Sequence, residues 1–560
     1  MAKRRRPYEH QADCHAVKRV RRYDTDHLSP LSDELLLRIF SNLPVSGLVL
    51  CQRVSNRFHS ICGDSQLWKS AYYNRFVRPR ASRIPGIRYS TTSPEVLLFS
   101  SRRSKWLGDD RLVKRGKEVD WKRQYRLRHN WSKGSCDRSH IQLTEPPSVA
   151  PLLVQLRDDI AYTVDTTTGL RAWHTKAGQK LLATVGLKGQ GDRIGKTSAP
   201  TSLAVDVSKE CSSNDCDVSV GFEDGHFSIY RLDRSRGCFS HKYSHPRSCN
   251  GMLAALAFSS PYILTLTEAQ LLSVYTFTSI SEVTPPDAVF TPPRLLSSLK
   301  SHTVWPPLSL SIRSTSADVI ASIAFAIPTY LSGWSVGLQE LQLTTQGEVV
   351  VSRLTSAVNQ GFTPLSPSLS QVSSPSISQM SARSEGNGSG SFPSTAKPTS
   401  LSYAHPYLLA SHPDNTLTLY LVSSTSAELS ISQGTRLWGH TSSVSGVSVG
   451  GRGKAVSVSL RGEELRVWEL EGGFASATSK RRLDAGDISV QVRPEKKSES
   501  DDGQHSKDRS TPETGIGLTL ERSIKELNFS PGWIGFDDEQ VIVLREEDQG
   551  RQTLAVYDFT

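Results

Sequence analysis

The 560-residue sequence lacks an apolar run long enough to cross a membrane. Its most apolar long stretch, residues 319–331, is interrupted by Ser322 and Pro328 and falls short of the ~18 apolar residues that a span needs. No apolar core follows the opening residues MAKRRRPYEH, so we do not expect export through a signal peptide. Glycine and proline, at 39 and 29 residues, are too few for a collagen-like or largely disordered chain.

Cysteine is also scarce, with eight residues and no tight spacing, which predicts free thiols in a reducing compartment. Cys211 and Cys216, even combined with His241 and His245, fit no common zinc ligand set. The glycine-rich residues 189–197 lack the spacing of a phosphate-binding loop. No nucleophile lies in a recognisable catalytic context. We therefore predict no metal site, no cofactor and no catalytic residue.

The net charge of +11 comes from two segments of the chain. Residues 1–22 carry eight Lys and Arg against two acidic residues, and residues 75–138 carry eighteen against six. We predict a disordered basic tail over residues 1–27. It contains two basic clusters, formed by Lys3, Arg4, Arg5 and Arg6 and by Lys18, Arg19, Arg21 and Arg22. Two clusters at this separation suit a bipartite nuclear import signal, so we expect the nucleus and the cytoplasm. The alternative is a solvated tail or one that contacts nucleic acid nonspecifically.

Residues 28–76 have the pattern of four short helices. Ser32 followed by two acidic residues can begin the first helix, and Pro44 ends it. Helices around 45–52, over 56–62 and from Asp64 onward follow. About 50 residues is near the lower limit for a self-sufficient core. Large apolar side chains should therefore remain exposed as a binding face.

This region resembles an F-box along its whole length. The residues that match the family pattern are Leu31, Glu34, Leu35, Leu36, Ile39, Phe40, Leu43, Pro44, Leu48, Arg53, Val54, Ser55, Leu67 and Trp68. Ser32 stands where the family usually has proline, which implies slightly weaker docking. The alternative is an ordinary helical core.

The resemblance implies docking on the cullin adaptor subunit of an SCF-type ubiquitin ligase. The residues predicted to dock, or to form the fold that presents the docking face, are Leu31, Leu35, Ile39, Phe40, Leu43, Pro44, Leu48, Val54 and Trp68.

Residues 77–148 are predicted to be a basic helical linker. Lys and Arg alternate with Trp121, Tyr125 and Trp131, a composition that could bind nucleic acid by stacking on bases. The alternative is that Tyr125, Leu127 and Trp131 face inward while basic side chains cover the outside. The phrase YRLRHNWSKG is similar to the linker that precedes the propeller in F-box/WD-repeat proteins, which favours the second interpretation.

Residues 149–560 consist of short β-type runs broken by turn residues, and they divide into seven degenerate units. The unit that ends at Trp468-Glu469 resembles a WD repeat, with Gly439-His440 at its start. Gly462 stands where that repeat has its turn Asp, so we expect the buried His–Asp network to be incomplete. Residues at about 358–400 and 490–518 lack large apolar side chains and are predicted to be disordered insertions.

The predicted fold class is multidomain: a small all-α F-box module and an all-β, seven-bladed WD-repeat-like β-propeller. The resemblance implies a non-catalytic substrate receptor, whose propeller binds an unknown protein for ubiquitination. Arg461 is the candidate substrate-binding residue, although one arginine does not form a phosphate-binding cluster. Two alternatives remain: an F-box scaffold that acts outside a ligase, and a propeller associated with chromatin or nucleic acid.

Overall fold

A computed structural model describes the chain in segments that form two compact units. The described residues are 28, 30–77, 119–144, 152–187 without 177 and 179, 198–208, 215–277, 292–300, 304–314, 318–329, 333–344, 348–357, 396–425, 428–460 without 452, 462, 464–470, 489–494, 532–546 and 551–560. The predicted tail, most of the predicted linker and most of both predicted insertions lie outside these residues.

The first unit contains the four predicted helices. They are α1 (Asp33–Phe40), α2 (Val45–Cys51), α3 (Asn56–Cys62) and α4 (Ser65–Tyr72), followed by a π-helical turn, η1 (Tyr73–Val77). The Ser55 hydroxyl caps α3 by accepting from the Phe58 N–H at 3.2 Å, and the Asp64 carboxylate caps α4 by accepting from the Gln66 N–H at 2.7 Å. The cap at Asp64 confirms the sequence prediction, the cap at Ser55 was not predicted, and the Ser32 hydroxyl makes no capping bond to α1.

Helix α7 (Trp121–Lys133) confirms the predicted helix in the basic connector. The Asp120 carboxylate accepts from the Arg123 N–H at 3.0 Å, which begins the helix. Gly134, with a φ of 73°, ends it. A Cβ atom at this position would lie 2.4 Å from the carbonyl oxygen of Gln491, so no other residue fits without backbone movement.

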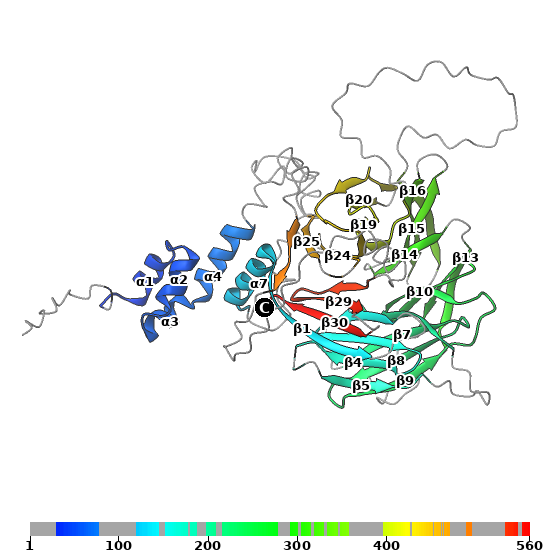
Figure 1. Ribbon diagram of the computed structural model, residues 1–560, viewed down its shortest axis with the longest axis horizontal. Helices are drawn as coiled ribbons and strands as arrows, with labels where there is room; N and C mark the ends of the chain where they lie inside the picture. The colour runs from blue at the N-terminus through cyan, green and yellow to red at the C-terminus, as the bar shows by residue number, and fades with distance from the viewer. Residues whose placement is uncertain are drawn as a thin grey trace, which may run out of the picture. The chain divides into compact units, whose positions relative to one another are not determined.

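The described residues of the second unit form seven sheets, antiparallel except for one short parallel pairing in blade seven, which confirms the predicted seven-bladed propeller (Figure 1). Blade one consists of β2 (Leu153–Arg157), β3 (Ile160–Asp165), β4 (Gly169–His174) and β5 (Leu181–Val185). Blade two consists of β6 (Pro200–Val205), β7 (Asp215–Phe222), β8 (Phe227–Asp233) and β9 (Cys238–Ser244). Blade three consists of β10 (Leu253–Ser259), β11 (Tyr262–Thr267), β12 (Leu271–Thr276) and β13 (Arg294–Lys300).

Blades four to six follow in chain order. Blade four consists of β14 (Trp305–Ser314), β15 (Asp318–Thr329), β16 (Gly333–Thr344) and β17 (Val349–Ser356). Blade five consists of β18 (Ser400–Ala404), β19 (Tyr407–Ser411) and β20 (Leu417–Ser424), and both β21 (Leu429–Ile431) and β22 (Thr435–Leu437) pair with β20. Blade six consists of β23 (Val444–Val449), β24 (Lys454–Ser459), β25 (Leu465–Glu469) and β26 (Ser489–Gln491). The first strand of each blade contacts the first strand of the next, and β2 contacts β28 (Ile534–Phe536), so the ring is closed.

Blade seven is completed by a strand from far upstream. Its strands β28, β29 (Gln540–Glu546) and β30 (Gln552–Asp558) are joined by β1 (Ser135–Thr144), which pairs antiparallel with β30 from Asp137↔Asp558 onward. The short strand β27 (Arg493–Pro494) pairs with the outer side of β1.

Two predicted boundaries are therefore wrong. The propeller begins within the residues assigned to the linker, because the ring needs β1 to protect an otherwise open sheet edge. Residues 490–494, assigned to the second insertion, belong to β26 and β27.

Candidate protein-docking surface

The helical unit has a compact core of its own. Six side chains are at most 7% exposed and contact one another: Leu36, Phe40, Leu48, Ile61, Cys62 and Leu67. Trp68 is also buried, and its indole N–H donates to the Cys62 carbonyl at 2.8 Å. Partly buried side chains, among them Leu37 and Phe58, pack against this core, and the exposed apolar side chains lie outside both groups.

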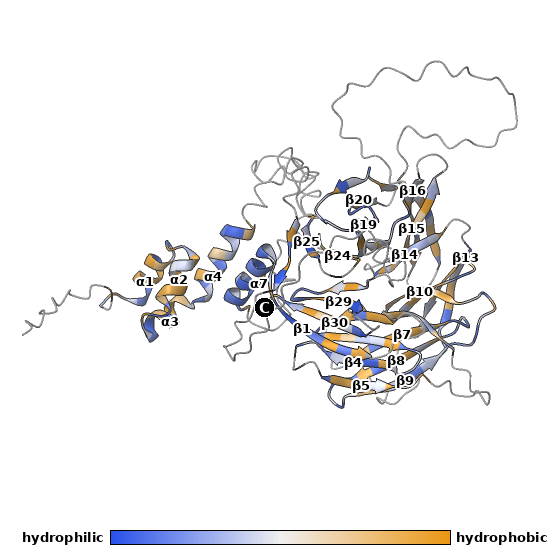
Figure 2. Cartoon of the chain, viewed as in Figure 1, coloured by the Kyte–Doolittle hydropathy of each residue, from blue (hydrophilic) through white to orange (hydrophobic). Residues whose placement is uncertain are grey.

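Several large apolar side chains of this unit face solvent. We call the five that lie on α1, on α2 and before α3 the exposed apolar set: Leu35 (51% exposed), Ile39 (41%), Val49 (39%), Leu50 (62%) and Val54 (69%). Leu35 and Ile39 lie one turn apart, so they share a face of α1. Figure 2 shows hydrophobic segments along these helices. Such a density of exposed aliphatic groups on so small a unit is typical of a protein-binding surface.

Burial divides the nine residues predicted for docking. Exposed residues are Leu35, Ile39, Pro44 and Val54; half-buried residues are Leu31 and Leu43; buried residues are Phe40, Leu48 and Trp68. The three buried residues form the fold that presents the docking face. The other six remain candidates for direct contact.

The sequence interpretation missed Val49 and Leu50. Helix α2 has three consecutive apolar residues, Leu48, Val49 and Leu50, and successive helical side chains point in different directions. Only Leu48 among them is buried. The run of three apolar residues could have predicted exposed side chains, because Val49 and Leu50 point away from the core when Leu48 points into it.

A groove lies beside the core of this unit. It has a volume of about 350 Å³ and is lined by residues of α1, α2, α4, η1 and α7 and of the loop between α1 and α2, among them Leu43, Pro44 and Tyr125. The Tyr125 hydroxyl accepts from the Arg75 guanidinium at 2.6 Å. Four predicted docking residues, Phe40, Leu43, Pro44 and Leu48, thus line a depression large enough for an apolar side chain of a partner.

The start of α1 is fixed by an ion pair. The Arg57 guanidinium donates to the Asp33 carboxylate at 2.6 Å and to the Leu31 carbonyl at 2.5 Å, which joins α3 to the beginning of α1. Ser32, the departure from the F-box pattern, makes no side-chain capping bond and has a φ of −67°. Because proline has nearly the same φ, the backbone here has the conformation that the usual proline would give it.

The aromatic residues of α7 are buried in both units. In the helical unit, Tyr125 packs edge-on against Trp68 with ring centres 5.6 Å apart, and Trp121 packs against Tyr72 at 5.5 Å. In the propeller unit, Trp131 stacks on Phe559 at 3.9 Å. The predicted inward orientation of Tyr125, Leu127 and Trp131 is confirmed. The rings of Tyr125 and Trp131 are therefore unavailable for stacking on bases, which removes the main feature that suggested a nucleic-acid groove.

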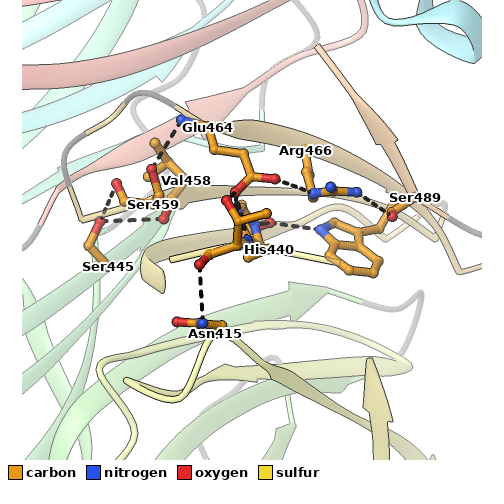
Figure 3. A network of polar contacts seen from close by, with 11 residues as sticks. Asn415, His440, Ser445, Val458, Ser459, Glu464, Arg466 and Ser489 are labelled. Atoms are coloured by element: carbon orange, nitrogen blue, oxygen red, sulfur yellow. Dashed lines mark hydrogen bonds and ion pairs between the residues drawn. The ribbon is translucent and has the colours of Figure 1, made fainter. Parts of the chain in front are cut away.

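Blade six contains a buried polar network (Figure 3), which is incomplete as the sequence predicted, because His440 Nδ1 has no hydrogen-bond partner among the described residues. Ser457 Oγ lies 2.6 Å from His440 Nε2 and accepts from the Trp468 indole at 2.7 Å. Glu464 replaces the missing turn Asp: its Oε2 lies 3.4 Å from His440 Nδ1 and accepts from Thr441 N at 2.9 Å. Gly462 occupies the expected position, and a longer carboxylate two residues later reaches the same place.

The network shifts two pKa values. Burial lowers the pKa of His440 to about 4, which keeps the imidazole neutral near pH 7. Burial by itself raises the pKa of Glu464, but hydrogen bonds from Thr441 and Arg466 outweigh it and leave that pKa lowered. This arrangement lies buried within the blade. Arg461 and the eight residues of the predicted import signal lie outside the described residues.

In the described segments, no group of three or more His, Cys, Asp or Glu side chains could hold a metal ion. Among the helices of those segments, none has the length and apolar character needed to span a bilayer.

Comparison with known proteins identifies both units. A family described as F-box protein pof12 beta-propeller matches residues 136–560, and the F-box-like family matches residues 33–74. The F-box protein dre-1 of Caenorhabditis elegans is 43% identical over 51 residues, which are 9% of this chain. The chain covers about 5% of that relative's length.

Solved propellers give weaker likenesses. The WD40 β-propeller domain of Doa1 matches with a TM-score of 0.32 and 11% identity, covering 74% of this chain and 95% of that domain. The Cps50 (Swd1) propeller of Myceliophteria thermophila matches with a TM-score of 0.37 and 10% identity, covering 74% and 98%.

Proposed function

The chain belongs to the F-box protein pof12 beta-propeller family, and from this we propose that it is the substrate-recognition subunit of an SCF-type ubiquitin ligase. The helical unit docks on the cullin adaptor subunit, and the propeller binds the protein to be ubiquitinated. The chain performs no covalent chemistry. It raises the effective concentration of substrate lysine near the ubiquitin thioester.

The observation that carries this proposal is the exposed apolar set on a unit whose core is already closed. Leu50 and Val54 leave 62% and 69% of their surfaces in solvent. Burying apolar surface gains roughly 25 cal/mol per Å², so a partner that covers these side chains is strongly favoured. The groove lined by Leu43 and Pro44 provides an adjacent place for a partner side chain.

The proposal is tested by affinity purification of the full chain and of a chain without residues 28–76. The full chain should retain adaptor and cullin, and the shortened chain should lose both while keeping substrate proteins. Adaptor without cullin would instead identify a scaffold that acts outside a ligase. Failure to retain the adaptor at all would overturn the proposal.

We further propose that the two basic clusters of the tail direct the chain to the nucleus, with a second population in the cytoplasm. Their residue content supports this: four basic residues in each cluster, from Lys3 to Arg22. Replacing all eight with alanine in a fluorescent fusion should shift the protein to the cytoplasm. An unchanged distribution would contradict the proposal.

A further inference from the structure

Trp438 stands out on the propeller because it faces solvent. It lies directly after β22, and 58% of its surface is exposed, whereas Trp468 in the next blade is 1% exposed. Its indole N–H has no hydrogen-bond partner among the residues that the structure describes. A large aromatic side chain with a free donor is the residue type most enriched at the energetic centres of protein interfaces.

The loop that carries Trp438 is held from both neighbouring blades. Asn415 of blade five donates to the Thr441 carbonyl at 3.3 Å, and Thr441 in turn donates from N and Oγ1 to Glu464 of blade six at 2.9 Å (Figure 3). Leu460 N also donates to the Ser443 carbonyl at 2.8 Å. The tryptophan is therefore presented on a backbone that is already ordered, which lowers the entropic cost of binding.

Strand direction places Trp438 beside a turn of blade five. Strands alternate in direction within a blade, so the turn between the second and third strands lies at the same end as the exit from the fourth. That turn contains Asp414 and Asn415, Arg436 lies in β22, and Trp438 is the first residue after that strand. The Arg436 guanidinium lies 5.5 Å from the centre of the Trp438 ring and forms an ion pair with Asp414.

Exposure shows which of these groups a partner would meet. The Arg436 side chain is 22% exposed, because it is covered by the tryptophan ring and donates to Thr416 Oγ1 at 3.2 Å. The Asp414 side chain is 43% exposed. An incoming chain therefore meets an aromatic surface beside a carboxylate, and these two features together are complementary to a cationic side chain.

We propose that Trp438 and Asp414 form a binding site for a lysine or arginine side chain of the protein that the propeller recognises. This inference rests on the proposed function, since it names the kind of segment that the propeller takes. The cation packs against the open part of the Trp438 ring and forms an ion pair with Asp414. Arg436 is a positioning residue that holds both groups in place.

The test is selection of a random dodecapeptide display library on the full chain, followed by fluorescence anisotropy of the selected peptides. Selected peptides should share a Lys or Arg at one position. Trp438→Ala should weaken their binding about tenfold or more, and Asp414→Asn should weaken it several-fold. Because Trp438 is exposed, the melting temperature of the variant should not change. Trp305→Ala, which alters another exposed tryptophan on blade four, should leave binding unchanged.

Three results would overturn the proposal: no enriched peptide, undiminished binding by Trp438→Ala, or enrichment of acidic peptides. If acidic peptides were enriched, Asp414→Asn would strengthen their binding, because Arg436 would no longer be paired with Asp414 and could pair with the peptide. The direction of the Asp414→Asn effect on affinity therefore distinguishes cationic from acidic partners. The readout does not involve the helical unit. A chain that binds basic peptides but not the adaptor would disprove the proposed function and leave this site intact.

Discussion

Two buried histidines should make the stability of the propeller fall between pH 6.5 and pH 5. Burial lowers the pKa of His412 and that of His440 to about 4, from an ordinary value of 6.5. Asp414 and Arg436 face His412, and Glu464 and Arg466 face His440. Below pH 6.5 the unfolded chain binds protons at these positions and the folded chain does not. Stability is therefore complete above pH 6.5 and is lost as the pH falls toward 4.

The magnitude follows from the width of this window. Each pH unit between the unfolded and the folded pKa costs about 1.4 kcal/mol per group, so lowering the pH from 6.5 to 5 should cost about 2 kcal/mol for each histidine. His440→Gln removes one of the two groups, and its loss of stability over the same range should be smaller by about 2 kcal/mol. Urea denaturation of the propeller at pH 7.5 and pH 5, followed by tryptophan fluorescence, measures both.

The matched control is His59→Gln, since His59 is exposed on α3 of the helical unit. This control should keep the pH dependence of the parent propeller. If His440→Gln loses as much stability as the parent between pH 7.5 and pH 5, the histidine is already protonated in the folded state. The description of the blade-six network would then be refuted.

Three further predictions concern the core and the thiols. Gly134→Ala places a Cβ atom 2.4 Å from a carbonyl oxygen at a φ of 73°, so the melting temperature of the propeller should fall by several degrees in calorimetry; an unchanged value would contradict this. Phe40→Ala empties a core position that is 3% exposed, at a cost of about 3–5 kcal/mol, and limited proteolysis should then cleave within residues 30–77 but spare the propeller. Burial raises the pKa of Cys216 to about 11, so at pH 8 iodoacetamide should modify the exposed Cys238 long before Cys216, as measured by peptide mass spectrometry; equal rates would contradict the burial.

The sequence was most informative where a local pattern and its packing agree. The spacing of Leu36 and Phe40 predicted α1, and the capping residue Asp64 marked the start of α4. In the propeller, the runs between turn residues predicted the strands, and the turns include the Asp-Gly pair at Asp224 and the Asp-Asn pair at Asp414. Gly225 and Asn415 have the positive φ values that such turns require.

Long-range pairing explains what the sequence left out. Nothing in the segment that forms β1 indicates that it pairs with a strand more than 400 residues later, because the pairing is fixed by closure of the ring. The replacement of the turn Asp by Glu464 was missed for a similar reason. A search at a fixed offset finds Gly462, whereas the three-dimensional network needs only a carboxylate oxygen at the right place.

Side-chain direction also escaped the sequence. Leu35 and Phe40 both match the F-box pattern, yet one is 51% exposed and the other is 3% exposed. A helix of eight residues has about two turns, and a short apolar stripe along it can be assigned to either side. Contacts with α3 and α4 determine which side of α1 is buried, and these contacts depend on how the helices pack.

The central claim is that the exposed apolar set binds the cullin adaptor. Leu35→Asp and Leu50→Asp each introduce a charge at a position that is more than half exposed. Leu35 lies in the first turn of α1, where aspartate is favourable, and Leu50 lies in the last turn of α2, where aspartate costs at most about 1 kcal/mol. Leu354→Asp alters an equally exposed leucine on blade four and serves as the matched control.

The decisive measurement is the affinity of each purified full-length variant for the purified adaptor, with circular dichroism to verify that the helices persist. The account predicts at least a tenfold loss for Leu35→Asp and Leu50→Asp and no change for Leu354→Asp. Unchanged affinity of both helical-unit variants, with their helices intact, would contradict it.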